Sequence, residues 1–486
     1  MTNQSKKQQL STSQNNCVTF KPEGDLLIQG IPGSGKSTIL LARANYLAEI
    51  KSEESILLLT FSRALTNYMG QLAIKTYDKT IPTKTFHQWG KELLEYTDYP
   101  HTRLILGDYR KDIIRFAKNI INKHRPEVNF PNMHVKKNQD KVLLNFLCNE
   151  IEWIKGTGIN SREEYLNVKR SGRGGDIRVT KENREAIYNV LEKYNELLQN
   201  HSRYQGIDGD DLARTLVEKS HQIPEEFKPD HILVDEAQDL YTMQLKAISS
   251  ISKKSLTIGA DKGQQIYRRS FTWKQAGIDI IGNRSQFLKQ TFRSTRQIIE
   301  LANNFQEKDE LYVRDTDFQQ AHVPNIEGKK PELIFVSNTK KEEEVIIDHV
   351  SKIRDTFPDD TIGIIATSHN KLNKFGTLLG DKGVPVYLLK EDGIDIISPG
   401  AKLVTFQSSK GLEFDHVIIT DLKKRKLPYG SPSPGEDNEQ FLSRERKKFY
   451  VAMTRAKKTL LLIAIKEYSP FIKELQSDLY KTIKLD

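Results

Sequence analysis

The chain has 486 residues, a mass of 55.9 kDa and a formal net charge of +10 at pH 7. At about 150 residues per domain, this length predicts about three domains. The mean hydropathy of -0.57 and the shortness of the apolar runs exclude a membrane protein. Two cysteines, Cys17 and Cys148, are too few for a disulfide framework or a zinc site, and the first ten residues lack the apolar core of a signal peptide. We therefore expect a cytoplasmic protein, and the excess of cations favours a polyanionic partner such as nucleic acid.

Short apolar runs alternate with longer amphipathic stretches, which predicts an α/β fold with mostly parallel sheets. The expected buried strands are 26–28, 56–61, 232–234, 256–258, 333–335, 362–366, 403–405, 417–419 and 460–463. Between residues 91 and 224 the apolar residues instead recur at helical spacing, so we expect a helical insertion there. Within it, the basic and glycine-rich segment 169–178 predicts a loop that is either solvated or in contact with DNA. A second exposed loop is expected at 429–437, and no internal repeat stands out.

The segment Gly30-Ile31-Pro32-Gly33-Ser34-Gly35-Lys36-Ser37 matches the phosphate-binding pattern G-x-x-x-x-G-K-[ST], between an expected strand and an expected helix over 38–50. Glycines allow successive backbone N–H groups to surround a phosphate, and the helix N-terminus adds partial positive charge. Lys36 is expected to reach the β and γ phosphates of a nucleotide, and the Ser37 hydroxyl to bind Mg²⁺. The expected nucleotide-binding residues here are Gly30, Gly33, Ser34, Gly35, Lys36, Ser37 and Thr38.

A second chemical signal follows the buried strand 232–234, which ends in Asp235 and Glu236. Asp235 is expected to hold the Mg²⁺ shell, and Glu236 to polarise the attacking water. A water-activating acid directly after a metal ligand favours hydrolysis of a nucleoside triphosphate over phosphoryl transfer to a small molecule.

Several segments, in this order along the chain, resemble motifs of superfamily 1A DNA helicases of the UvrD/Rep/PcrA type. They are LSTSQ (10–14), TFS (60–62), TFH (85–87), DEAQD (235–239), GADKGQQIY (259–267), TFRS (291–294), TFQSSKGLEF (405–414) and YVAMTRAK (450–457). The resemblance spans residues 10 to 465. It implies two RecA-like lobes with the nucleotide between them. Lobe 1A would comprise 1–90 and 225–287, the helical insertion 1B would be 91–224, and lobe 2A would be 288–486.

The resemblance also implies roles for particular side chains. Gln14 would read the adenine, Phe292 would stack on it, and Glu413 would bind the ribose. Gln264 would couple the γ-phosphate to DNA, and Arg293 and Arg455 would bring positive charge to the transferring phosphate from the second lobe. The residues implied to line the single-stranded DNA path are Thr60, Phe61, His87, Tyr267, Trp273 and Thr405. For Trp273, packing in the core is the alternative, because residues 268–272 separate it from the Ile-Tyr pair.

The sequence departs from the family pattern in three places. Only the segment 389–402 stands where relatives insert a large 2B domain, so we expect a vestigial 2B insertion. The reduced domain bears on separation of a DNA duplex by this chain, whereas ATP-driven movement along one strand is still expected. Gln407 stands where relatives usually carry histidine. The chain ends soon after the Arg455 motif, so we expect no appended nuclease.

The leading hypothesis is an ATP- and Mg²⁺-dependent translocase or helicase of 3′ to 5′ polarity, acting on single-stranded DNA or 3′-tailed duplex. The alternative is a DNA-stimulated ATPase subunit that senses DNA and regulates a partner nuclease or effector, for example in anti-phage defence. A P-loop kinase is a weaker hypothesis, because it leaves Gln264, Arg293 and Arg455 without a role.

Overall fold

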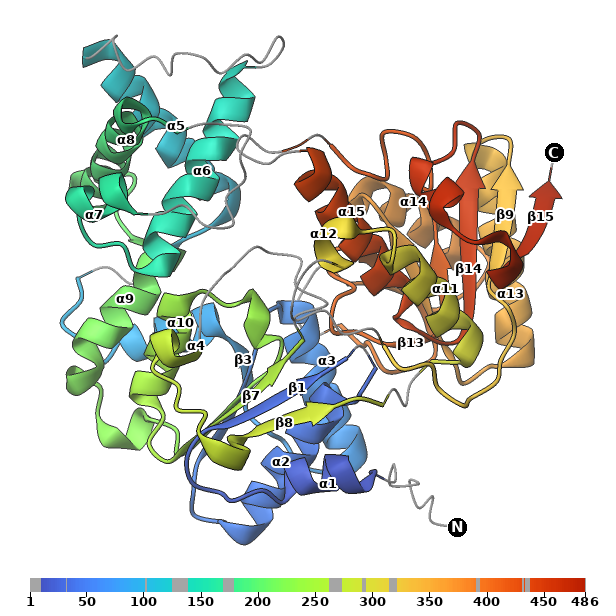
Figure 1. The fold of residues 1–486 in the computed structure, drawn as a ribbon, viewed down its shortest axis with the longest axis horizontal. Helices are drawn as coiled ribbons and strands as arrows, with labels where there is room; N and C mark the ends of the chain where they lie inside the picture. Colours follow the sequence, from blue (N-terminus) through green and yellow to red (C-terminus); the bar gives the residue numbers. More distant parts are fainter. Residues whose placement is uncertain are drawn as a thin grey trace.

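The computed structural model describes residues 10–31, 33–100, 103–124, 139–168, 179–261, 273–290, 294–313, 321–389, 394–430, 432 and 438–485. Two α/β lobes stand side by side, and a helical region rises from the first of them (Figure 1). Each lobe is built on one sheet whose strands pair in parallel. The expected α/β class with two RecA-like lobes is confirmed. In the part of the chain that the structure describes, no helix has the length and apolar character needed to cross a bilayer.

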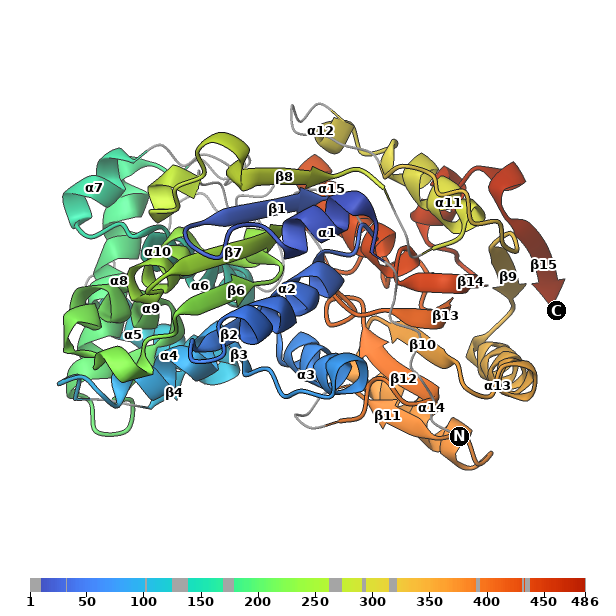
Figure 2. The ribbon, with the colours of Figure 1, turned by 90° about the horizontal axis from the view of Figure 1, so that it is seen from below.

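The first lobe has a six-stranded sheet in the order β3-β2-β6-β7-β1-β8. Its strands are β1 (Leu26–Gly30), β2 (Ile56–Thr60), β3 (Thr83–Thr85), β6 (His231–Val234), β7 (Ser255–Ala260) and β8 (Ser285–Leu288). One face packs on α1 (Thr12–Val18), α2 (Lys36–Ile50) and α3 (Arg63–Tyr77), and the other on α4 (Phe86–Leu94), α9 (Gly209–Lys219) and α10 (Thr242–Ile251). Figure 2 shows α2 and α3 lying along one face of this sheet. Both faces are covered, which explains why the central strands read as continuous apolar runs.

The structure confirms that the insertion in the first lobe is helical. It contains α5 (Gly107–His124), α6 (Gln139–Thr157), α7 (Arg162–Asn167) and α8 (Lys181–Asn200), packed around a core of their own. A two-stranded sheet of β4 (Leu104–Ile105) and β5 (Ile207–Asp208) closes its base. The basic segment 169–178 lies outside the described residues.

The second lobe has a seven-stranded sheet in the order β11-β12-β10-β13-β14-β9-β15. Its strands are β9 (Glu332–Val336), β10 (Thr361–Ala366), β11 (Val386–Leu388), β12 (Gly400–Thr405), β13 (Phe414–Ile419), β14 (Ala456–Ile465) and β15 (Lys481–Leu485). Its helices are α11 (Arg296–Gln306), α12 (Glu310–Val313), α13 (Thr339–Thr356), α14 (His369–Gly380) and α15 (Asn438–Met453). All nine expected strands are present, whereas β3, β8, β11 and β15 of the two lobes and β4 and β5 of the helical insertion were not predicted. The four missed strands of the lobes are edge strands, and most of their side chains are exposed or only half-buried.

The connection between β11 and β12 also joins the two lobes. Its described part, 394–399, contains no helix or strand. The Gln71 amide on α3 donates from Nε2 to the Ile394 carbonyl (2.7 Å) and accepts from the Ile396 N–H at Oε1 (2.8 Å). Ile396 is buried in an apolar cluster that contains residues of both lobes. A short segment at this position therefore ties the second lobe to α3 of the first.

Candidate nucleotide site and inter-lobe pocket

The phosphate-binding loop has the backbone that its glycines predict. Gly33 and Gly35 have φ values of 76° and 85°, in the left-handed region that favours glycine, and α2 begins directly afterwards at Lys36. A Cβ on Gly30 would lie 2.4 Å from the Ser34 hydroxyl oxygen, so the loop needs glycine there. That hydroxyl is buried and has no hydrogen-bond partner in the structure as described. An unsatisfied donor at a helix N-terminus fits a phosphate oxygen.

Lys36 is buried against the loop that precedes it. Its Nζ donates to the carbonyls of Gly30 (2.8 Å) and Ile31 (3.1 Å), and it forms an ion pair with Asp261 at 3.2 Å. Thr38 is half-buried one turn into α2. The ammonium group is therefore held beside the loop in which a phosphate would bind.

Ser37 and Asp235 meet although they are far apart in the sequence. The Ser37 hydroxyl donates to Asp235 Oδ2 at 2.5 Å, and the Glu236 N–H donates to Asp235 Oδ1 at 2.9 Å. Burial, together with the adjacent Glu236 carboxylate, raises the pKa of Asp235 to about 6. A hydroxyl and a buried carboxylate are oxygen ligands of the kind that Mg²⁺ prefers. The predicted metal-binding pair is thus brought together.

Glu236 adopts a left-handed conformation, with φ of 55°, immediately after β6. Its carboxylate accepts a hydrogen bond from Gln238 Nε2. Burial alone would raise the pKa of Glu236, but the positive charges of Lys410, Lys36 and Arg455 outweigh it and lower the pKa. The carboxylate is therefore kept ionised, which is the state that a general base needs.

Lys410 is a functional candidate that sequence reasoning missed. It belongs to the second lobe, yet its buried Nζ lies 3.5 Å from Glu236 Oε2 and 2.5 Å from Asp239 Oδ2 of the first lobe. Burial acts to lower the pKa of Lys410, but the carboxylates of Asp239 and Glu236 raise it overall. The signal was present, because Lys410 lies inside the 405–414 segment. Only the fold places it across the seam from Glu236.

The other predicted nucleotide-site residues differ in their surroundings. Arg455 is buried in the second lobe, and its guanidinium donates to the carbonyls of Val451 (2.9 Å) and Leu412 (3.2 Å). Glu413 forms an ion pair with Lys457 at 3.4 Å. Gln14 is buried on α1 and donates from Nε2 to the Ser34 carbonyl at 3.0 Å, which places it beside the phosphate-binding loop. Gln264, Phe292 and Arg293 lie outside the described residues.

A pocket of about 460 Å³ lies between the lobes, next to Glu236 and Lys410. It brings together two residues predicted for the DNA path, Phe61 of the first lobe and Thr405 of the second. Gln407 also lines this pocket. Thr60, which precedes Phe61, is buried, and its hydroxyl pairs with that of Thr66 at 2.6 Å. We call this space the inter-lobe pocket.

A smaller cavity of about 260 Å³ lies where the helical insertion meets the first lobe. His87 and Phe61 line it, together with Arg110 and Asp208, which form an ion pair at 3.0 Å. Trp273 is partly buried and packs against the core of the first lobe, while Tyr267 lies outside the described residues. Phe61 therefore lines both spaces, the inter-lobe pocket together with Thr405 and this smaller cavity together with Thr60 and His87.

The comparisons with known proteins agree with this fold. Residues 10–289 match the UvrD/REP helicase N-terminal domain family, and residues 388–467 match the UvrD-like helicase C-terminal domain family. Because the first match alone covers more than half of the sequence, the chain belongs to the UvrD/REP helicase family.

Individual relatives are more distant. A probable DNA helicase of Mycoplasma pneumoniae is 24% identical over 507 residues, which cover 93% of this chain and 84% of that protein. A probable DNA helicase II homolog of Mycoplasma capricolum is 25% identical over 342 residues, which cover 64% of this chain and 43% of that protein. The ATP-dependent DNA helicase PcrA of Staphylococcus aureus is 24% identical over 359 residues, which cover 67% of this chain and 44% of that protein. The matched region thus spans less than half the length of the last two relatives.

Proposed function

We propose that the chain is an ATP-driven motor that moves along single-stranded DNA in the 3′ to 5′ direction and acts on single strands or 3′-tailed duplexes. Membership of the UvrD/REP helicase family supports the DNA substrate and the use of ATP with Mg²⁺. The polarity is carried over from the family resemblance. We also propose the domain division 1–90, 91–224, 225–287 and 288–486, with 389–402 in place of a 2B domain.

The observation that carries the proposal is the meeting of Ser37, Asp235 and Glu236 opposite Lys410 at the seam between the lobes. Bound MgATP would supply the γ-phosphoryl group and a metal that neutralises its developing charge. The backbone of residues 33–37 and the free Ser34 hydroxyl would hold the phosphates, and Lys36 would exchange its carbonyl partners for phosphate oxygens. Ser37 and Asp235 would hold the metal.

Glu236 would activate the attacking water, and cations of the second lobe would couple hydrolysis to lobe movement. Glu236 accepts a proton from the attacking water, and its lowered pKa keeps it ready to do so at neutral pH. Lys410 contacts the first lobe from the second, so a change in the distance between the lobes changes the electrostatic environment of Glu236. Arg455, with Arg293, is proposed to turn toward the phosphate when the lobes close. Hydrolysis and lobe movement would then be coupled.

The strand itself is proposed to run through the inter-lobe pocket. Phe61 offers a ring for base stacking on one side, and Thr405 and Gln407 offer polar groups for the backbone on the other. His87, Tyr267 and Trp273 would extend this path over the first lobe, and Gln14, Phe292 and Glu413 would select the nucleoside of ATP.

Steady-state ATP turnover, measured with and without oligo(dT), tests the proposal. We expect single-stranded DNA to raise turnover at least about tenfold, and Glu236→Gln to remove turnover while leaving ATP binding intact. A strand-displacement assay on 3′-tailed and 5′-tailed duplexes then tests polarity, because only the 3′-tailed substrate should be opened or tracked. Equal turnover with and without DNA would contradict the proposed motor.

A further inference from the structure

Arg43, on α2, is completely buried in the first lobe, and the nucleotide chemistry proposed above gives it no role. Its guanidinium donates to five oxygens, which are the Thr257 hydroxyl (2.9 Å) and the carbonyls of Cys17 (3.4 Å), Val18 (3.0 Å), Phe20 (2.8 Å) and Lys21 (2.9 Å). Burial lowers the pKa of Arg43 to about 10, so the group stays charged at neutral pH. Burying a cation among neutral oxygens costs free energy, so we expect this arrangement to serve more than the stability of the core.

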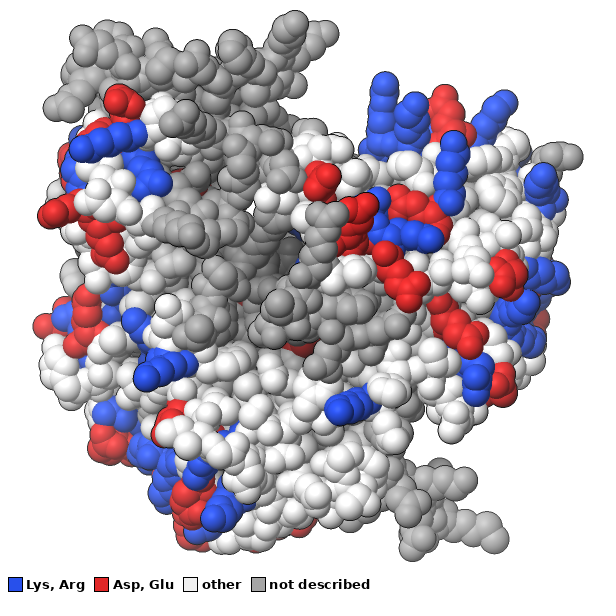
Figure 3. Space-filling view, in the orientation of Figure 1, with Lys and Arg blue, Asp and Glu red and all other residues white. Residues whose placement is uncertain are grey.

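The four carbonyls belong to the end of α1 and to the turn that follows it. The last carbonyls of a helix have no partner within the helix. A planar guanidinium with five N–H donors can satisfy several of them at once, which an ammonium group cannot. Figures 1 and 2 both show α1 lying beside α2. In Figure 3 the surface over α1 shows almost no charged side chains, which agrees with a cation that holds this helix from inside the lobe.

The helix held in this way also carries Gln14, which lies against the phosphate-binding loop. Its Oε1 accepts from the Ser11 N–H at 2.9 Å, and its Nε2 donates to the Ser34 carbonyl at 3.0 Å. These two bonds fix the orientation of the carboxamide and leave one lone pair and one N–H for a ligand. Such a pair matches the N6 amino group and N7 of adenine, whereas guanine offers two acceptors, O6 and N7, at the same edge.

Arg43 connects this group to the phosphate chemistry through a single helix. Lys36 begins α2 at the phosphate-binding loop, and Arg43 follows about two turns later, or ~10 Å along the axis. The end of α1 is therefore fixed to the same helix that would hold the phosphates. If α1 could slide along α2, the carboxamide of Gln14 would lose its fixed place relative to a bound triphosphate. A shift of about 1 Å is enough to weaken a directional contact severely.

We propose that Arg43 is a positioning residue for the choice of nucleotide: by holding the end of α1 against α2, it keeps Gln14 where its carboxamide selects adenine over guanine. The inference rests on the proposed function, in which Gln14 helps to select the nucleoside of ATP. A purely structural Arg43 would stabilise the lobe without affecting the preference between ATP and GTP. The two nucleotides share the triphosphate, so the ratio of their kcat/KM values isolates the contact with the base.

Steady-state turnover of ATP and of GTP, each with saturating oligo(dT), tests this inference. The wild type should prefer ATP by at least about tenfold in kcat/KM, the order of discrimination expected from a two-point contact with a base. Arg43→Lys keeps the charge but cannot reach all five acceptors, so the preference should fall to within about threefold of unity. The loss should come from a higher KM for ATP, with kcat within about twofold of the wild type and the GTP parameters unchanged.

Arg284→Lys is the matched control. Arg284 Nη1 donates to the carbonyls of Glu23 (3.1 Å) and Asp25 (3.0 Å), at the other end of the segment that joins α1 to β1. This variant should keep the wild-type preference for ATP. Gln14→Ala should abolish the preference, and adding Arg43→Lys to it should have no further effect, because both changes act through the same carboxamide.

Circular dichroism shows whether Arg43→Lys is folded. If it is not, Thr257→Val takes its place, because it removes one acceptor of the guanidinium and should lower the preference for ATP by about threefold. Equal losses of kcat/KM for ATP and GTP would overturn the inference, and so would an unchanged preference in the folded variant. Full preference for ATP in Gln14→Ala, or none in the wild type, would instead contradict the role proposed for Gln14, so the two failures are distinguishable.

Discussion

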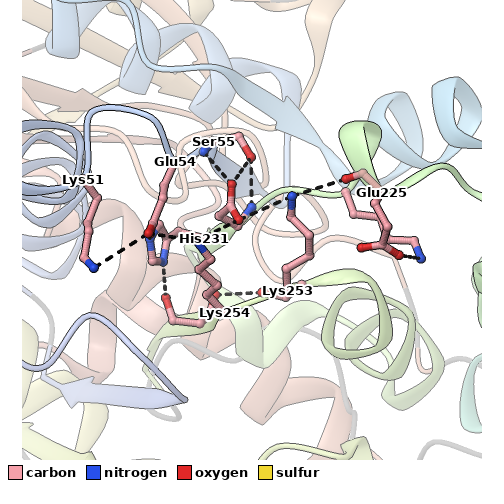
Figure 4. A network of polar contacts seen from close by, with 11 residues as sticks. Lys51, Glu54, Ser55, Glu225, His231, Lys253 and Lys254 are labelled. Carbon is pink, nitrogen blue, oxygen red and sulfur yellow. Dashed lines mark hydrogen bonds and ion pairs between the residues drawn. The ribbon is translucent and has the colours of Figure 1, made fainter.

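The two lobes are alike at the edge where their parallel strands begin and different at the edge where the strands end. In the first lobe, His231 starts the central strand β6, with Nδ1 2.7 Å from the Ser255 hydroxyl and Nε2 2.6 Å from Glu54 Oε2. The preceding Asp230 accepts hydrogen bonds at Oδ2 from the Ser55 N–H and hydroxyl, each 2.9 Å long. Figure 4 shows this network, with Lys253 and Lys254 beside it.

The second lobe repeats the arrangement with a different set of residues. His416 Nδ1 lies 2.7 Å from the Thr459 hydroxyl, and Nε2 lies 3.0 Å from Asp360 Oδ2. Asp415 accepts hydrogen bonds from the Thr361 N–H (3.0 Å) and hydroxyl (2.9 Å). The register is also the same, because His231 pairs with Ser255 across the sheet and His416 pairs with Thr459. The structure therefore contains an internal repeat that the sequence analysis did not detect.

At the opposite edge the lobes diverge. Glu236 and Asp421 follow the central strands in the same left-handed conformation, with φ of 55° and 62°. In the first lobe this edge carries the phosphate-binding loop. In the second lobe Lys371 lies 2.9 Å from Glu342 Oε1 and 2.7 Å from Asp421 Oδ1, and these charges satisfy one another. The strand-start edge is thus alike in both lobes. At the strand-end edge, the first lobe carries the phosphate-binding loop and the second carries the ion pairs of Lys371 with Glu342 and Asp421.

Replacing Lys36, which is buried, or Lys371, which is half-buried, with alanine should distinguish the two strand-end edges most strongly. Lys36→Ala should reduce ATP turnover by at least about a hundredfold. It should also cost stability, because the buried Asp261 carboxylate loses its ion-pair partner. Lys371→Ala should cost about 3 kcal/mol of unfolding free energy, because it leaves two buried carboxylates without a counter-charge. Chemical denaturation and turnover measured on both variants check this. Loss of turnover without loss of stability in Lys371→Ala would contradict it.

Lys410→Ala should reduce DNA-stimulated turnover by about tenfold or more, because the variant removes a second-lobe cation that lies 3.5 Å from Glu236. Lys410→Arg is the matched control, since it keeps the charge, and it should retain a larger part of the stimulation. ATP binding, followed with a fluorescent analogue, should change little in either variant. Unaltered stimulation in Lys410→Ala would show that the contact across the seam is only structural.

The twin histidines sharpen the likeness between the lobes. His231→Ala and His416→Ala should each lower the unfolding free energy by about 1–3 kcal/mol, because each removes a buried imidazole together with both of its hydrogen bonds. The affinity for ATP should not change in either variant. Urea denaturation checks the prediction, and a large effect in one lobe with none in the other would contradict the equivalence of the networks.

The same histidines predict a pH dependence of stability. Burial lowers the pKa of His231 and of His416 below the ordinary value of 6.5, against the opposing pull of Glu54 and Asp360. The unfolded chain therefore binds protons that the folded chain does not, so this contribution is present above pH 6.5 and is lost as the pH falls through the folded pKa. Asp230 does not titrate in this window, because hydrogen bonds from Ser55 outweigh its burial and lower its pKa to about 2. In the double variant His231→Asn/His416→Asn, the denaturation midpoint should fall less between pH 7.5 and pH 5.5 than it does in the wild type.

The contact between α3 and the segment 394–396 should give the smallest effect. Gln71→Ala should cost about 1–2 kcal/mol, because both hydrogen bonds to Ile394 and Ile396 are lost. Gln71→Glu is informative because it can still accept from the Ile396 N–H but cannot donate to the Ile394 carbonyl. The thermal unfolding midpoint should be highest for the wild type, lower for Gln71→Glu and lowest for Gln71→Ala. Identical midpoints would show that this segment does not hold the lobes together.

Local sequence patterns predicted the features of the fold and of the candidate site that are formed by consecutive residues. The phosphate-binding loop, the strand ending at Asp235 and the buried central strands all have local signatures, and they are found where they were expected. Pairs formed by tertiary contact were missed. Lys410 opposite Glu236, Lys371 between Glu342 and Asp421, and the two histidine networks join residues separated by tens to hundreds of positions. Short edge strands were missed because their side chains are only partly buried.

The central claim is that the second lobe completes the nucleotide site of the first. Single-turnover ATP hydrolysis by wild type and Arg455→Lys, in the presence of saturating oligo(dT), tests it most directly. Arg455→Lys should bind a fluorescent ATP analogue nearly as well as wild type but hydrolyse ATP at least about a hundredfold more slowly. Hydrolysis at the wild-type rate by a folded Arg455→Lys protein would contradict the account.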